Sequence, residues 1–166
     1  MNALTGLGNW SSDDQPLRED GFTITLDGAE VTAYPGETLW KIAKRAGETI
    51  PHLCYSEAPD YRGDGNCRAC MVEIDGERTL AASCIREARA GMVVRSASSR
   101  RAGEARAMVV ELLAADMPAE AHNPDVSSHF MAMAELLAVD VGHARETLGG
   151  ARETVREWLG DTVEEW

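Results

Sequence analysis

The placement of four cysteines constrains this 166-residue chain more than any other feature of its sequence. Cys67 and Cys70 form a C-x-x-C pair, which twelve residues separate from Cys54 and thirteen residues separate from Cys84. The chain has no other cysteine. Four thiolates are the ligand set of a [2Fe–2S] cluster and also of a structural zinc site. The sequence therefore predicts a metal centre built from these four side chains.

The spacing favours iron and sulfide over zinc. Zinc ribbons usually bring two C-x-x-C knuckles together, whereas this chain has one pair and two single cysteines, as ferredoxins do. A plant-type ferredoxin has C-x4-C-x2-C and a distant fourth cysteine, so the first loop here is longer and the fourth cysteine nearer. Gly63 and Gly65 suit a backbone that passes close to a bulky inorganic group. A colourless, zinc-stabilised assembly protein is the alternative.

The residues before the cysteines predict two strands and a helix. Apolar and polar residues alternate over 22–26, and the Asp27-Gly28 dipeptide that follows is a strong hairpin signal. Val31 and Ala33 continue the alternation in a second strand. Residues 37–47 change to helical periodicity, and Gly47 suits a C-terminal cap.

The cysteine region itself predicts a loop held between hairpins. No regular element is expected over 52–70, because this backbone must wrap around the metal group. Met71–Ile74 reads as a strand, the Asp75-Gly76 turn leads to a returning strand over Arg78–Ala81, and Met92–Arg95 reads as a last strand. His52 invites a ligand role, because histidine replaces cysteine in Rieske centres, but with four cysteines available a surface or outer position is favoured.

Several segments resemble the N-terminal [2Fe–2S] domain of three related proteins. These are the large iron–sulfur subunit of respiratory complex I, the diaphorase part of NAD-reducing hydrogenases, and the α subunit of molybdenum NAD-dependent formate dehydrogenases. The resemblance extends over about residues 20–139, and SSHFMAMAE (Ser127–Glu135) is most similar to the formate dehydrogenase. The other matching segments are Ile50–Tyr55, Gly65–Ile74, Ala81–Cys84 and Arg100–Pro118.

This resemblance implies an α+β fold, a β-grasp [2Fe–2S] ferredoxin-like domain over 20–98 with an α-helical extension over 99–166. It implies one [2Fe–2S] cluster whose ligands are Cys54, Cys67, Cys70 and Cys84. The expected function is relay of single electrons between a flavin subunit that handles NAD(H) and another redox centre, such as a molybdenum catalytic subunit. A free, diffusible [2Fe–2S] ferredoxin is the alternative.

The extension shows two apolar patterns at helical spacing. The first predicts a helix packed on the ferredoxin core and ending near Met117-Pro118, and the second predicts another amphipathic helix. The first stripe contains Ala105, Met108, Val109, Leu112 and Leu113, and the second contains Val126, Phe130, Met133 and Leu137. His122, His129 and His143 are expected to be ordinary surface or capping residues. With no cysteine after Cys84, the chain is expected to be a small subunit, a diverged relative or a fragment.

The tail carries a heptad-like apolar seam interrupted by Gly149-Gly150, which costs about 1 kcal/mol per glycine in a helix. Docking onto a partner subunit is favoured for it, with packing on the chain's own core or a frayed end as alternatives. Trp158 and Trp166 are the expected contact residues. The seam contains Val141, Ala144, Leu148, Ala151, Val155, Trp158 and Thr162.

Composition excludes several other functions. The net charge of −12 disfavours a nucleic-acid partner, and residues 101–166 alone contribute −8, either as a solvated surface or as a face that steers a basic partner. No apolar run is long enough to span a membrane, and no secretory signal is evident, so a cytoplasmic location with reduced thiols is expected. Residues 1–19 read as a flexible arm. No nucleotide-binding fingerprint, P-loop or nucleophile elbow occurs, so no catalytic residues are expected.

Overall fold

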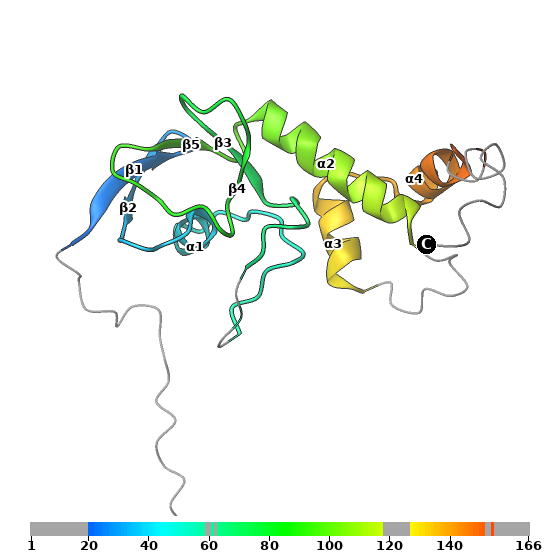
Figure 1. The fold of residues 1–166 in the computed structure, drawn as a ribbon, viewed down its shortest axis with the longest axis horizontal. Coiled ribbons are helices and arrows are strands. Elements are labelled where there is room, and N and C mark those ends of the chain that lie inside the picture. The colour runs from blue at the N-terminus through cyan, green and yellow to red at the C-terminus, as the bar shows by residue number, and fades with distance from the viewer. Residues whose placement is uncertain (1–19, 59–60, 62, 118–126, 152–153, 155–166) are drawn as a thin grey trace, which may run out of the picture.

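The computed structural model describes residues 20–58, 61, 63–117, 127–151 and 154. In this part of the chain a five-stranded sheet and a short helix form one half, and three further helices extend to one side of it (Figure 1). The predicted α+β class with a helical extension is therefore confirmed. The predicted arm over 1–19 lies outside the described residues.

The N-terminal hairpin forms as the alternation predicts. Strand β1 (Phe22–Leu26) pairs with antiparallel β2 (Ala29–Ala33), with Phe22 opposite Ala33. The turn residues Asp27 and Gly28 have φ of 48° and 88°. Positive φ at both turn positions matches the right-handed twist of the paired strands. The tight turn therefore fixes the register that points Ile24 and Leu26 into the core.

The remaining strands complete a mixed sheet in the order β2-β1-β5-β3-β4. Strand β5 (Val93–Arg95) lies between its neighbours, parallel to β1 and antiparallel to β3 (Met71–Ile74). The predicted returning strand over Arg78–Ala81 was wrong in its extent, because only Ala81–Ala82 (β4) pairs with β3. Residues 78 and 79 form bends, so the ladder closes just before Cys84 and not directly after the turn.

Helix α1 (Leu39–Arg45) covers the sheet as predicted. The Thr38 hydroxyl caps its first turn by accepting from the Lys41 amide at 3.5 Å. Gly47 adopts φ of 84° just beyond the last turn, a conformation that most other residues adopt only with strain. Leu39, Ile42 and other apolar side chains of this helix are buried in the core. The packed helix therefore fixes where the chain enters the cysteine loop.

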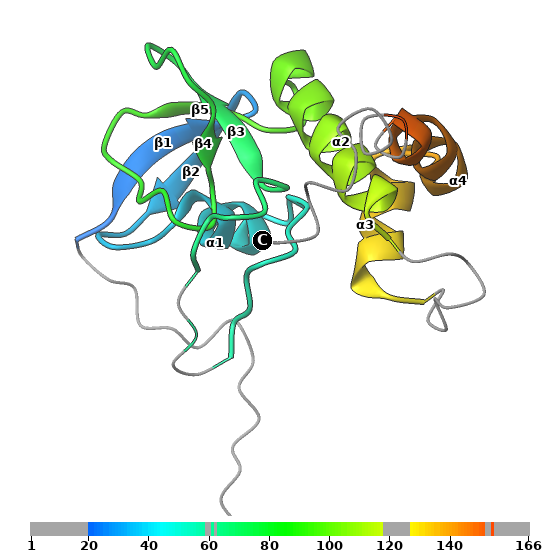
Figure 2. The ribbon, with the colours of Figure 1, turned by 45° about the vertical axis from the view of Figure 1, so that its right-hand side comes forward.

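Helix α2 (Arg100–Ala115) begins beside β3 and runs away from the sheet (Figure 2). The Ser99 hydroxyl caps it, accepting from the Ala102 amide at 3.1 Å and donating to Glu73 on β3 at 2.6 Å. Helices α3 (His129–Leu136) and α4 (Val141–Ala144) pack against α2. The Ser99 side chain thus links the start of the extension to β3.

The buried face of α2 differs from the predicted one. The stripe that includes Met108 and Leu112 was expected to face the core, but these two side chains are 60% and 55% exposed. The face that packs on the sheet and on the other helices consists of Ala102, Arg106, Val110 and Ala114. Small side chains allow the helix to approach its neighbours closely, whereas the longer apolar side chains are left at its flank.

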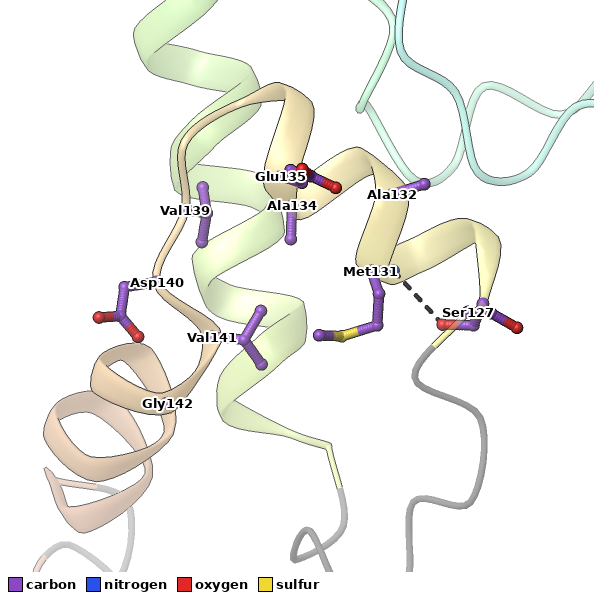
Figure 3. Close-up of a pocket in the computed structure, with 10 residues that line it drawn as sticks. Ser127, Met131, Ala132, Ala134, Glu135, Val139, Asp140, Val141 and Gly142 are labelled. Atoms are coloured by element: carbon purple, nitrogen blue, oxygen red, sulfur yellow. Dashed lines mark hydrogen bonds between the residues drawn. The ribbon is translucent and has the colours of Figure 1, made fainter.

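Helix α3 bears out most of the second predicted helix. Met133 is buried, Phe130 and Leu137 are half-buried, and Val126 lies outside the described residues. A groove of about 530 Å³ lies between α3 and the first turn of α4. Figure 3 shows that Met131 and Val141 point toward one another across it. Its polar side chains serve the helices themselves, because Ser128 caps α3 and Asp140 caps α4. This groove is therefore not a strong candidate for a site.

The seam in the tail is only partly described. Ala144 is buried in α4, the helix that packs against α2. Val141 is half-buried, and Leu148 is 39% exposed. The chain continues through Arg145–Gly149 as a π-helix, so Gly149 is accommodated within helical structure. The seam positions from Val155 on, and the expected contact residue Trp166, lie outside the described residues. None of the described helices is both long and apolar enough to cross a membrane.

Candidate metal centre

Two of the four cysteines are brought together by the β3–β4 hairpin. Cys70 immediately precedes β3, and Cys84 follows β4 by one residue. Between them, Ser83 donates twice to the Cys70 carbonyl oxygen, from its amide at 3.1 Å and from its hydroxyl at 2.8 Å. Both cysteines are buried. The hairpin therefore positions a rigid, buried pair of thiols.

The other two cysteines meet across the loop that precedes β3. The Cys67 amide lies 3.4 Å from the Cys54 sulfur and donates to it. Both residues are half-buried, so this pair lies nearer to solvent than the hairpin pair. Among the described residues, no three cysteine, histidine or acidic side chains converge as they would around a single metal ion. Two pairs of thiols fit a two-iron cluster, in which each iron takes two protein ligands.

Burial, hydrogen bonds and neighbouring thiols shift the pKa values of two of the four cysteines. Burial, together with the neighbouring Cys70, Cys54 and Cys67, raises the pKa of Cys84 to about 12. Burial also raises the pKa of Cys67, but hydrogen bonds from the backbone of Ala69, Cys54 and Leu53 outweigh this effect and lower it overall. Thiolates at close range repel one another. A bound metal ion offsets this repulsion and displaces the thiol protons, so such a group of cysteines favours metal binding.

The glycines of the loop are required by neighbouring protein atoms. Gly65 has φ of 66°, and a Cβ atom there would lie 2.7 Å from the Ile85 Cδ1 atom. A Cβ atom at Gly63 would lie 3.0 Å from the Tyr55 ring and 3.3 Å from the Cys84 carbonyl oxygen. The sequence predicted a close approach to an inorganic group. The structure adds that the loop packs directly on the segment that carries Cys84.

The turn between Cys67 and Cys70 contains a feature that the sequence analysis missed. Arg68 has φ of 58°, which is uncommon for a residue other than glycine. Ala69, next to it, is fully buried, in keeping with the small residue predicted for this turn. The left-handed residue reverses the chain between the two cysteines. A C-x-x-C spacing suggests such a turn, but only the backbone angles show which residue takes the unusual conformation.

His52 joins the loop to the helical extension and is not placed as a ligand. The His129 Nε2 atom of α3 donates to the His52 carbonyl oxygen at 2.6 Å, and the two rings lie 4.9 Å apart. On its other side the His52 ring packs edge-on against Trp40, with ring centroids 4.7 Å apart. Burial lowers the pKa of His52. His129, predicted to be an ordinary surface residue, thus helps to hold the loop, whereas His122 lies outside the described residues and His143 is exposed.

A groove of about 620 Å³ opens beside the cysteines and reaches Cys84. Tyr61 and Ile85 lie at this groove and are both partly exposed, and the Tyr61 hydroxyl donates to the Cys54 carbonyl oxygen at 2.7 Å. Lys41 of α1 also lines this groove. The site thus combines a buried and a half-buried pair of thiols with one open side, which suits a group that exchanges electrons with another protein.

Comparison with known proteins agrees with this geometry. Residues 19–99 match the family described as the 2Fe-2S iron-sulfur cluster binding domain. This part of the chain belongs to that family. The match includes all four cysteines and all five strands, and it ends just before α2. The cofactor predicted from the cysteine spacing, a single [2Fe–2S] cluster, is therefore confirmed for this domain.

Similar proteins extend the comparison. This chain is 40% identical over 99 residues to the NADP-reducing hydrogenase subunit HndD of Solidesulfovibrio fructosivorans, covering 58% of this chain and 17% of that subunit. It is 37% identical over 95 residues to the mitochondrial NADH-ubiquinone oxidoreductase 78 kDa subunit of Candida albicans, covering 57% and 13%. A solved structure of an NAD+-reducing [NiFe]-hydrogenase superposes with a TM-score of 0.62 at 30% identity, covering 72% of this chain and 50% of that one.

These relatives confirm part of the predicted resemblance. The likeness to complex I and to NAD-reducing hydrogenases is confirmed, whereas the finer likeness to a formate dehydrogenase is not shown by them. The chain spans only 17% and 13% of the length of these two curated relatives. The stretch that this chain shares with them is thus a small part of much larger proteins.

Proposed function

We propose that this chain relays single electrons within an NAD-linked oxidoreductase complex, and that Cys54, Cys67, Cys70 and Cys84 hold its [2Fe–2S] cluster. The observation that carries the proposal is the grouping of the four thiols into a buried pair and a half-buried pair. A [2Fe–2S] cluster supplies one-electron chemistry and leaves bond-making steps to other centres. The names of the similar proteins, which are subunits of a hydrogenase and of NADH-ubiquinone oxidoreductase, support the NAD-linked setting.

The residues around the thiols would serve this relay in three ways. The Ser83 bonds to the Cys70 carbonyl hold the ligand backbone rigid, which keeps rearrangement small when charge changes. Backbone amides directed at the Cys54 and Cys67 sulfurs stabilise added negative charge. Burial of Cys70 and Cys84 excludes water from one side of the site, while the groove at Cys84 leaves an approach for a partner.

The finer proposal is a formate dehydrogenase-like complex in the cytoplasm, with a flavin subunit that handles NAD(H) and a molybdenum catalytic subunit. It rests on the likeness of Ser127–Glu135, the segment that contains most of α3. The bond from His129 to the His52 carbonyl supports a role for this segment in holding the cluster loop. A hydrogenase diaphorase or a complex I relative is the second candidate, favoured by the names of the similar proteins.

We further propose that residues 20–98 form the ferredoxin-like unit and that the extension over 99–166 docks onto an adjoining subunit of the complex. Met108 and Leu112 form an exposed apolar strip on α2. Exposed carboxylates of Glu104 and Glu111 lie on the same helix, and residues 101–166 carry a net charge of −8. This combination fits a partner surface with an apolar centre and basic residues around it.

Purification of the untagged native protein at high salt, with every co-eluting chain identified by mass, tests the relay. We expect a flavin subunit to co-elute and NADH to reduce the cluster in that preparation. Co-elution of a molybdenum subunit would support the formate dehydrogenase proposal, and a hydrogenase subunit would support the second candidate. A red-brown protein that elutes alone and binds other proteins only at low salt would instead be a diffusible ferredoxin. Leu112→Glu should abolish co-elution, whereas Thr147→Glu, at another exposed helical position, should not.

A further inference from the structure

Arg106 on α2 is an unusual residue in this fold. Its side chain is 5% exposed, and it is the one charged residue that the structure buries among the residues it describes. Arginine is almost never fully buried unless it is paired, and its guanidinium keeps its charge in proteins. A buried positive charge therefore lies within the interface between α2 and the rest of the molecule.

The hydrogen bonds of Arg106 are made to neutral groups. Its Nη2 atom donates to the Ser96 carbonyl oxygen at 2.7 Å and to the Ser96 hydroxyl at 3.4 Å. Its Nε atom donates to the Ala102 carbonyl oxygen at 3.2 Å. In the described part of the chain, the ion pairs formed by arginines involve other residues such as Arg86, Arg95 and Arg100, and none involves Arg106. The charge is held in place without being neutralised by direct contact.

Ser96, which accepts from Arg106, directly follows β5, and β5 pairs with β3 at Arg95 and Glu73. Burial lowers the pKa of Arg106, and the Asp27 carboxylate and the Cys70 sulfur raise it. Asp27 is already engaged, since it accepts from the amides of Ser96, Ala97 and Ser98. Cys70 immediately precedes β3, the strand on which α2 packs. The remaining field of the guanidinium therefore acts on the side of the site that holds the buried thiol pair.

We propose that Arg106 raises the reduction potential of the [2Fe–2S] cluster. The inference rests on the proposed function, because it assumes that Cys70 is a ligand. On reduction by a flavin partner, one electron enters and the charge of the cluster with its four thiolates changes from −2 to −3. No bond forms or breaks, and no proton is required. A fixed positive charge in a low-dielectric interior attracts the more negative state more strongly, so it favours the reduced form.

A redox titration with chemical mediators, followed by the electron paramagnetic resonance signal of the reduced cluster, tests this role. At the midpoint potential of the wild-type protein, we expect Arg106→Gln to lower the ratio of reduced to oxidised cluster roughly tenfold, which corresponds to 59 mV for one electron. Arg106→Lys, which keeps the charge, should recover most of that ratio. Arg100→Gln removes the same charge from a solvent-exposed position of the helix and should leave the ratio nearly unchanged.

A purely structural role predicts a different pattern. If Arg106→Gln lowers the free energy of unfolding but keeps the wild-type ratio, the proposal is overturned. It is also overturned if Arg106→Lys shifts the ratio as far as Arg106→Gln does. Arg106→Met removes the charge with different packing and should match Arg106→Gln. If neither neutral variant retains the cluster while Arg106→Lys does so at the wild-type stoichiometry but with an altered ratio, the residue is structural.

The titration needs no NAD-linked partner, so its failure can be told apart from failure of the proposed function. A wild-type chain with a normal signal but no effect of Arg106 contradicts only the tuning role. A wild-type chain that takes up no electron contradicts the relay itself.

Discussion

The pattern of apolar residues predicts which side chains are buried in the sheet and α1, but it does not do so in helix α2. In the sheet half, the residues that the sequence pattern points inward, such as Ile24 and Ile42, are the ones that are buried. In α2, the long apolar side chains of Met108 and Leu112 are exposed, and the buried face includes a charge, Arg106. In the sheet half, the apolar side chains pack into one buried core. Helix α2 packs through small residues and leaves an apolar strip exposed in the described part of the chain.

The largest expected effect is loss of the cluster, which should follow a change in the cysteine loop but not a change on α2. Cys67→Ser should abolish or severely damage the cluster, because a hydroxyl is a poor replacement for a thiolate ligand of iron. Leu112→Ser, a change at the exposed strip of α2, should leave it intact. Visible absorption and iron content measure both. An unchanged visible spectrum in Cys67→Ser would remove that residue from the ligand set.

A second prediction concerns the close packing of the cysteine loop. Gly65→Ala should lower the free energy of unfolding by roughly 2–4 kcal/mol, because the new methyl group meets Ile85 and the backbone has φ of 66°. Gly76→Ala has a similar φ but open space around it, so it should cost only about 1–2 kcal/mol. Urea denaturation measures both values. Adding Ile85→Ala to Gly65→Ala should recover the steric part, and equal costs for the two glycines would contradict close packing of this loop.

The two faces of α2 provide a third prediction. Val110→Ala should lower the free energy of unfolding by about 1–3 kcal/mol, because Val110 is fully buried. Leu112→Ala removes a larger side chain from an exposed position and should change stability by less than about 0.5 kcal/mol. Thermal or urea unfolding of the isolated chain decides between them. A larger loss of unfolding free energy in Leu112→Ala than in Val110→Ala would indicate that the face predicted from the sequence is the buried one.

The smallest expected effect lies at the joint between the two regions. Burial raises the pKa of Asp27, but hydrogen bonds from Ser98, Ser96 and Ala97 outweigh it and lower the pKa overall. A lowered pKa adds stability above the unfolded pKa of about 3.9, and this stability is lost as the pH falls through the folded value. Asp27→Asn should therefore cost up to about 1 kcal/mol at pH 7, since the carboxylate is only partly buried.

The pH dependence is the check on this last effect. The difference in unfolding free energy between wild type and Asp27→Asn should be constant from pH 7 to about pH 5 and should shrink below about pH 4. A difference that persists unchanged at pH 3 would show that the charge of Asp27 makes no contribution.

Most of the sheet half could be predicted from the sequence because its signals are local. The Asp27-Gly28 turn, the alternation in β1 and the capping glycine at Gly47 each act within a few residues. The parallel pairing of β1 with β5 could not be predicted in this way, since the two strands are far apart in the chain. The same limit applies to the extent of β4, which depends on bends at residues 78 and 79.

The site was predictable in its ligand set and less so in its surroundings. Cysteine spacing indicated which four residues to examine, but the pairing of Cys54 with Cys67 depends on the folded loop. The contact between His52 and His129 joins residues that are distant in sequence, so no local pattern could indicate it. Arg106 was hidden for another reason. Helical periodicity identifies apolar stripes, and a buried arginine does not belong to one.

The measurement that tests the account most directly is analysis of iron and acid-labile sulfide in the purified native chain, combined with electron paramagnetic resonance after chemical reduction. We expect about two irons and two sulfides per chain, and a signal from about one unpaired electron per chain. A colourless protein with about one zinc ion per chain and no signal would contradict the account. In that case the four cysteines would hold a structural site, and neither an electron relay nor a tuning role for Arg106 could follow.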